Sequence, residues 1–145
     1  MIAVDTNVFV GGVQTFNPVL RTAARHSIKQ LFRQGEQLYS FPQNLVEFWN
    51  VATRPATPNG LRLSSEQTAR LVDRFQTIVQ LLPETEDIFP AWRTLVLQYR
   101  VAGIHVHDAR IAAAMIVHRV PRILAFDVDD FKRYTLVSVI DLNSV

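Results

Sequence analysis

The segment Ile2-Ala3-Val4-Asp5-Thr6-Asn7, at the start of the chain, places a short aliphatic run directly before an acid. A similar run, Ile123-Leu124-Ala125-Phe126, comes directly before Asp127 near the other end. Short apolar runs of this kind are typical of strands that are buried on both faces. We therefore predict two buried strands, each of which ends at a carboxylate.

Helical patterns and further short strands fill the chain between these two runs. Asn17-Pro18 is a typical helix start and predicts a helix to about Gln34, which Gly35 ends. Ser64 and Gln67 match a capping box that opens a helix to about Leu82, and a short extended piece over residues 79–82 is the alternative for its end. Periodicity also predicts helices over residues 43–53, from about 85 to near 103 and over 108–119, a loop over 54–60, and strands over 38–41 and 136–140.

Strands that alternate with helices indicate the fold class. They predict a single α/β domain over residues 1–145, with a mostly parallel sheet and helices on both faces. In such sheets, ligands bind outside the carboxyl ends of the strands. Asp5 and Asp127 are therefore expected on the same edge of the sheet.

Composition excludes several classes of protein. The 145 residues are 48% hydrophobic and 19% charged, which is typical of a globular protein, and the formal net charge of +2 argues only weakly for a nucleic-acid partner. The absence of Cys excludes disulfides, thiolate nucleophiles and zinc–sulfur sites. The N-terminus has no basic stretch typical of a signal peptide, and the most apolar run, residues 111–117, is too short to span a bilayer. We expect a cytoplasmic protein with no membrane association.

Each acid has a structural as well as a functional interpretation. Asp5 is either a turn residue or a site residue, and Asp108 either caps the helix that it opens or also binds a metal. Glu47 shares a polar helix stripe with Gln43 and is expected by default to face solvent. Residues 127–130 hold three acids, which repel one another unless solvent or a cation neutralises them. Mg²⁺ prefers such oxygen ligands.

His105 and His107 are a second set of possible ligands. On a strand, two residues apart, they would point to opposite faces, and no third soft ligand is evident. A surface or packing role is expected for both.

Taken together, these residues resemble the PIN-domain ribonucleases. Asp5-Thr6-Asn7 resembles the opening motif of that family, and Glu47 in Leu45-Val46-Glu47-Phe48 resembles its second acidic position. The third position is similar to Asp108 in His107-Asp108-Ala109-Arg110-Ile111-Ala112-Ala113, and the fourth to Asp127 in Phe126-Asp127-Val128-Asp129-Asp130-Phe131. The order and spacing of the acids also resemble the single-domain toxins of the VapC type, and residues 52–64 resemble one subgroup of them. Two departures are Ala125, where the family often has Thr or Ser, and Asp127, where many toxins have Asn.

The resemblance implies a fold and a function. The fold would be PIN-like, with three α/β/α layers. The function would be Mg²⁺- or Mn²⁺-dependent endonucleolytic cleavage of single-stranded RNA regions, with tRNA or rRNA as the usual targets. Asp5, Asp108 and Asp127, with Asp130, would bind the metal.

The remaining roles follow from the same resemblance. Glu47 would bind a second ion or orient the attacking water, and Thr6 and Asn7 would support the metal ligands through hydrogen bonds. The expected partners are RNA, a small VapB-like antitoxin and a second copy of the chain.

Three alternatives remain open. The chain is also compatible with a PIN-domain RNA-processing nuclease that has no antitoxin, and with a non-catalytic module that binds metal or RNA. A phosphatase with Asp5 as the nucleophile is a third possibility, but that chemistry usually needs a second acid two residues on, where this chain has Asn7.

Overall fold

The computed structural model describes residues 1–57 and 59–145, and its centre is a parallel sheet. Five strands are found in this part of the chain, in the order β3-β2-β1-β4-β5, and every neighbouring pair is parallel. They are β1 (Ile2–Val4), β2 (Leu38–Ser40), β3 (Val79–Leu81), β4 (Arg122–Ala125) and β5 (Ser138–Asp141). The sheet confirms the predicted α/β class.

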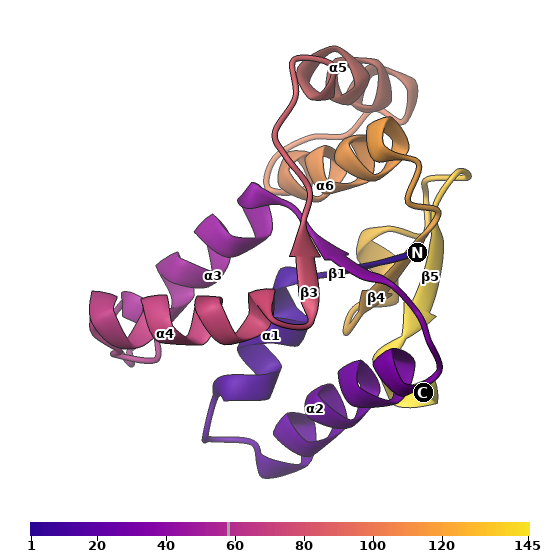
Figure 1. The fold of residues 1–145 in the computed structure, drawn as a ribbon. Helices are drawn as coiled ribbons and strands as arrows, with labels where there is room; N and C mark the ends of the chain where they lie inside the picture. Colours follow the sequence, from indigo (N-terminus) through magenta and orange to yellow (C-terminus); the bar gives the residue numbers. More distant parts are fainter. Residues whose placement is uncertain (58) are drawn as a thin grey trace.

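Helices connect the strands and cover both faces of the sheet (Figure 1). They are α1 (Thr6–Val13), α2 (Pro18–Arg33), α3 (Pro42–Thr53), α4 (Ser65–Gln76), α5 (Ile88–Gln98) and α6 (His105–His118), with the short 3₁₀ helices η1 (Val128–Asp130) and η2 (Leu142–Ser144). In Figure 1, α5 and α6 lie together on one side of the strands, and α1 to α4 lie on the other.

A hydrophobic cluster lies on each face of the sheet and packs the helices against it. There are two clusters because successive residues of a strand point to opposite faces. In β1, Ala3 packs with the apolar residues of α5 and α6, whereas Ile2 and Val4 pack with those of α1 to α4. In β4, Ile123 and Leu124 divide in the same way. The result is the expected three-layer arrangement.

Several local predictions are confirmed. The Asn17 side chain accepts a hydrogen bond from the Leu20 backbone N–H at 3.0 Å, and Pro18 is the first residue of α2. Ser64 and Gln67 form both hydrogen bonds of the capping box at the start of α4. Gly35 follows α2 with a φ of 82°, a conformation that glycine adopts without strain.

Other boundaries differ from the predictions. α1 was not predicted at all. α4 ends at Gln76, earlier than the predicted end near Leu82, and residues 79–81 form a strand, as the alternative of an extended piece over residues 79–82 predicted. α5 starts later than predicted, with Asp87 and not Thr85 as its N-cap residue. The predicted loop over residues 54–60 includes Pro58, which lies outside the described residues.

The start of α6 determines whether Asp108 caps this helix. This helix begins at His105, three residues earlier than predicted, and Ile104 is its N-cap residue. Asp108 is therefore not a capping residue, and its carboxylate projects from the first turn of the helix. Within residues 1–57 and 59–145, no helix is both long enough and apolar enough to cross a membrane.

Candidate metal centre

Asp5 lies at the carboxyl end of the central strand β1 and directly precedes α1. Its backbone N–H donates to the Leu124 carbonyl oxygen at 3.0 Å, which ties this end of β1 to β4. The residue is only 5% exposed. Within the described part of the chain, no other side chain donates a hydrogen bond to its carboxylate, and such a group is costly to bury as an anion.

Glu47 reaches the same region from α3. Its Oε2 accepts a hydrogen bond from the Thr6 hydroxyl at 2.8 Å, and its Oε1 accepts one from Gln43 Nε2 at 2.7 Å. Thr6 in turn accepts from Asn44 Nδ2 at 3.2 Å. Glu47 is half-buried, so the expectation that it faces solvent is wrong.

Arg110 fixes the orientation of the Gln43 amide. Its Nη1 donates to Gln43 Oε1 at 2.9 Å, and its Nη2 pairs with Glu84. Because a guanidinium has no acceptor, the amide oxygen must face Arg110 and the amide NH₂ must face Glu47. That NH₂ group also donates to the His107 carbonyl oxygen at 2.9 Å. Donors on both of its oxygens hold Glu47 in one orientation.

α6 and η1 bring a group of possible metal ligands together. One ligand atom each from His105, Asp108 and Asp130 lies within 4.8 Å of the others. His105 and Asp108 are three residues apart in the first turn of α6, where side chains share a helix face. Asp130 is the last residue of η1, in the turn that follows β4.

The pKa values show that these acids act on one another. Burial raises the pKa of Asp5 from 3.8 to about 7, with repulsion from Asp108 next. A hydrogen bond from the Thr6 backbone opposes this shift, and Glu47 and Asp130 add to it. Burial, Asp130 and Glu47 raise the pKa of Asp108 from 3.8 to about 6, although His105 and His107 oppose the shift. Burial and Asp127 also raise the pKa of Asp130. Four carboxylates that are distant in sequence therefore share one electrostatic environment.

The other predicted site residues lie at the margin of this group. Asp127 is exposed, and its Oδ1 accepts a hydrogen bond from the Asp129 backbone N–H at 3.1 Å, which caps η1. Its proximity to the cluster is seen in its effect on the pKa of Asp130. Asn7 is exposed, and within the described residues its side chain makes no hydrogen bond. A metal-binding role for Asp127 and a supporting role for Asn7 stay predictions.

Sequence reasoning assigned no role at this site to His105, Arg110 or Tyr134. His105 and His107 were weighed only with the geometry of a strand, whereas the helical spacing His105-x-x-Asp108 would have indicated a shared face. Tyr134 is 1% exposed, its hydroxyl has no hydrogen-bond partner among the described residues, and Asp108 is among the groups that raise its pKa. No local sequence signal indicates that Tyr134 lies near Asp108.

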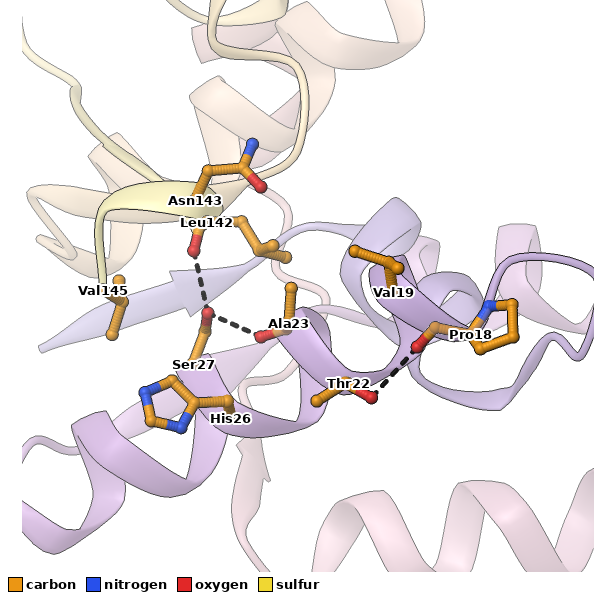
Figure 2. Close-up of a pocket in the computed structure, with 9 residues that line it drawn as sticks. All are labelled: Pro18, Val19, Thr22, Ala23, His26, Ser27, Leu142, Asn143 and Val145. Carbon is orange, nitrogen blue, oxygen red and sulfur yellow. Dashed lines mark hydrogen bonds between the residues drawn. The ribbon is translucent and has the colours of Figure 1, made fainter.

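A surface hollow lies elsewhere on the molecule. A groove of about 550 Å³ lies between α2 and the C-terminal residues and is lined mostly by apolar side chains. Figure 2 shows the residues that line it. The single Ser27 hydroxyl proton is shared between the Leu142 and Ala23 carbonyl oxygens, each 2.9 Å from Oγ, and this contact holds the C-terminal segment on α2. None of the residues that line this groove is an acid of the cluster.

The acidic cluster at the carboxyl edge of the sheet can be compared with known families. The PIN domain family matches residues 2–136. This chain belongs to the PIN domain family. The search of curated proteins found no match.

Solved structures with a similar fold are toxins of toxin–antitoxin complexes. This PIN domain is 16% identical to a chain of VapBC2 from Rickettsia felis, crystallised with a DNA fragment from its promoter, with a TM-score of 0.71 and coverage of 97% of this chain and 98% of that one. A chain of FitAcB from Neisseria gonorrhoeae is 17% identical, with a TM-score of 0.69 and full coverage of both chains. VapC20 from Mycobacterium tuberculosis, described as a toxin that cleaves the sarcin–ricin loop, is 20% identical, with a TM-score of 0.66 and coverage of 92% and 95%. At these identities the likeness establishes the fold of this PIN domain.

The side chains present fit a divalent cation. Asp5 is a buried carboxylate with no other side chain as a donor, and Asp108 and Asp130 repel each other. Within the described residues, none of the ion pairs involves Asp5, Asp108 or Asp130. Carboxylate oxygens suit Mg²⁺ and Mn²⁺, and such an ion would remove the mutual repulsion.

Proposed function

We propose that this PIN domain is a divalent-metal-dependent endoribonuclease that cleaves single-stranded regions of RNA and acts as the toxin of a type II toxin–antitoxin system. The observation that carries the proposal is the convergence of Asp5, Glu47, Asp108 and Asp130 from four different elements. Membership of a nuclease family supports the reaction class. tRNA and rRNA are the expected substrates.

Acidic side chains alone would repel RNA, so the reaction needs a cation. Asp5, Asp108 and Asp130 would hold it, with Asp127 at the exposed side. A bound divalent ion supplies positive charge that offsets the charge on the phosphate oxygens. Water loses a proton as it attacks the phosphorus in line, the bond to the leaving ribose oxygen breaks, and this oxygen takes up a proton from solvent.

Glu47 has the contacts expected of a group that orients the attacking water. Thr6 and Gln43 occupy one lone pair on each of its oxygens, and each oxygen has another to accept a hydrogen bond from water. In this proposal, Glu47 therefore acts as an acceptor and Thr6 keeps it in place.

The test is an RNA cleavage assay with Mg²⁺, with EDTA, and with the variant Asp5→Asn. We expect EDTA to abolish cleavage and Asp5→Asn to lower the cleavage rate roughly 100-fold or more. Loss of even a residue that only supports a metal ligand lowers metal affinity or activity about 10–100-fold. Asp73→Asn, which changes an exposed acid of α4, is the matched control and should retain activity. Cleavage that survives EDTA or Asp5→Asn would exclude this mechanism.

The toxin role has a separate test. Expression of the chain alone is expected to arrest bacterial growth, and Asp5→Asn is expected to relieve the arrest. Co-expression of a small protein encoded beside it should restore growth, because an antitoxin tail with a basic side chain would cover the acidic site. An active ribonuclease without growth arrest would favour the RNA-processing alternative. Sedimentation analysis of the purified chain would test the expected homodimer.

A further inference from the structure

His105 shares the acidic site but is not a carboxylate. One of its ring nitrogens lies within 4.8 Å of a carboxylate oxygen of Asp108 and of Asp130, and those two oxygens are equally near each other. Ligand atoms about 2.1 Å from one ion lie at most about 4.2 Å apart. Small side-chain rotations would therefore bring all three atoms to one cation.

Two further observations distinguish this group from an ordinary acidic surface. Asp5 is 5% exposed and adds a buried carboxylate that interacts electrostatically with Asp108 and Asp130. In residues 1–57 and 59–145, neither ring nitrogen of His105 has a hydrogen-bond or ion-pair partner that would hold it elsewhere. The imidazole is thus free to turn towards the acids.

His107 provides a contrast within the same turn of α6. A helix advances about 100° per residue, so His107 lies about 200° around the axis from His105. His107 has no atom in the group formed by His105, Asp108 and Asp130. It nevertheless lowers the pKa of Asp108, as His105 does. Comparison of the two histidines therefore separates ligation from a general effect of positive charge.

We propose that His105 is a metal ligand of the candidate site and that its imidazole makes the site prefer a divalent first-row transition ion over Mg²⁺. The proposal deepens the proposed function, on which it rests, by naming the class of ion. Mg²⁺ prefers oxygen ligands and keeps its waters, whereas imidazole nitrogen suits first-row transition ions. A site with carboxylates alone would lack this selectivity.

The test measures Mn²⁺ binding to the full chain without RNA at pH 7.5. Free Mn²⁺ is followed by electron paramagnetic resonance, and competition with Mg²⁺ gives the ratio of the two dissociation constants. We expect the wild type to favour Mn²⁺ and His105→Ala to lose about 10-fold or more of that preference through weaker Mn²⁺ binding. His107→Ala should keep the wild-type ratio.

Pulsed electron paramagnetic resonance detects ligation directly. Bound Mn²⁺ should show coupling to a ¹⁴N nucleus in the wild type and in His107→Ala, and this coupling should be lost in His105→Ala. Circular dichroism of the metal-free variants checks their fold, which should be intact because both histidines are exposed. Absence of ¹⁴N coupling in the wild type, its persistence in His105→Ala, or an equal loss of preference in both variants would overturn the proposal.

The outcome is distinguishable from failure of the proposed function. RNA cleavage that depends on Asp5, together with an unchanged Mn²⁺ preference in His105→Ala, would refute the role of His105 and leave the nuclease assignment standing. ¹⁴N-coupled Mn²⁺ in a chain that cleaves no RNA would support ligation by His105 and refute the nuclease assignment.

Discussion

The two sides of the acidic site differ in how their side chains are held. On the α3 side, Glu47 receives hydrogen bonds from Thr6 and Gln43, and Arg110 fixes Gln43. On the side of α6 and η1, Asp108 and Asp130 repel each other, and within the described chain no side chain donates to either of them. The protein itself therefore orients Glu47, whereas in the proposed function a cation would hold Asp108 and Asp130 together.

The largest expected effects come from the side that lacks donors. Asp108→Asn and Asp130→Asn should each lower Mn²⁺ affinity and RNA cleavage by roughly 100-fold, since each removes a charge that the cation needs. Asp127→Asn should lower both by only a few-fold, because Asp127 is exposed and already caps η1. Calorimetric titration and initial cleavage rates would measure the series. A larger loss for Asp127→Asn than for Asp130→Asn would contradict the proposed division of roles.

The donor-rich side should respond less strongly. Gln43→Leu and Arg110→Met are each expected to lower the cleavage rate about 10-fold, because Glu47 loses a donor or the amide of Gln43 is free to turn. The metal affinity should change little, and the double variant should be no slower than either single variant if Arg110 acts through Gln43.

Glu84→Gln is the matched control for Arg110. It weakens the ion pair of Arg110 with Glu84 but leaves the hydrogen bond from Arg110 to Gln43 in place. Its cleavage rate should stay near the wild-type rate, because an exposed ion pair contributes little. Equal losses in Glu84→Gln and Arg110→Met would show that Arg110 is only a structural ion-pair residue.

The pH dependence of stability tests the repulsion directly. Folding raises the pKa of Asp5 from 3.8 to about 7 and the pKa of Asp108 from 3.8 to about 6. Between pH 3.8 and these raised pKa values, the folded chain therefore binds more protons than the unfolded chain. The free energy of unfolding of the metal-free protein should therefore be highest near pH 4 and should fall as the pH rises to about 7. Thermal melts in EDTA would measure this fall.

Two additions sharpen that measurement. Mn²⁺ should restore the melting temperature at pH 7 and above, because it stabilises the ionised carboxylates. Asp5→Asn should flatten the EDTA profile, since it removes the acid with the most strongly raised pKa. A metal-free profile that rises from pH 4 to 7 in the wild type would contradict the buried repulsion.

The smallest effect is expected at Asn7. Its side chain is exposed and makes no hydrogen bond within the described residues. Asn7→Ala should therefore change the cleavage rate by no more than about 2-fold and leave the free energy of unfolding almost unchanged. Thr6→Val is the comparison, because it removes the hydroxyl that donates to Glu47 and should slow cleavage about 10-fold. An Asn7→Ala loss as large as that of Thr6→Val would restore the predicted supporting role of Asn7.

Local sequence signals predicted much of the fold. The caps at Asn17 and Ser64 and the apolar strands at Ile2–Val4 and Arg122–Ala125 depend on neighbouring residues, which the sequence displays directly. α1 was missed because its residues Thr6–Val13 include Gly11 and Gly12, which are poor helix formers. Packing of α1 against α2 and α3 overrides this local preference.

The site was predictable only where its residues follow a strand or match the family pattern. Asp5 and Asp108 were predicted as site residues in this way, but the position of Asp130 relative to Asp127 depends on the short 3₁₀ turn of η1. His105 depends on where α6 begins, and Arg110 on a contact with α3 that is 67 residues away in the sequence. Such features arise from tertiary packing, which no local pattern encodes.

The central claim is that distant carboxylates meet to bind a divalent ion, and diffraction from crystals grown with Mn²⁺ tests it most directly. Data collected at a wavelength where manganese scatters anomalously should show a peak in contact with Asp108 and Asp130 and close to Asp5. The same experiment on Asp5→Asn crystals should show a weaker peak or none. A wild-type crystal in saturating Mn²⁺ with no peak among these carboxylates, or with its only peak elsewhere, would contradict the account.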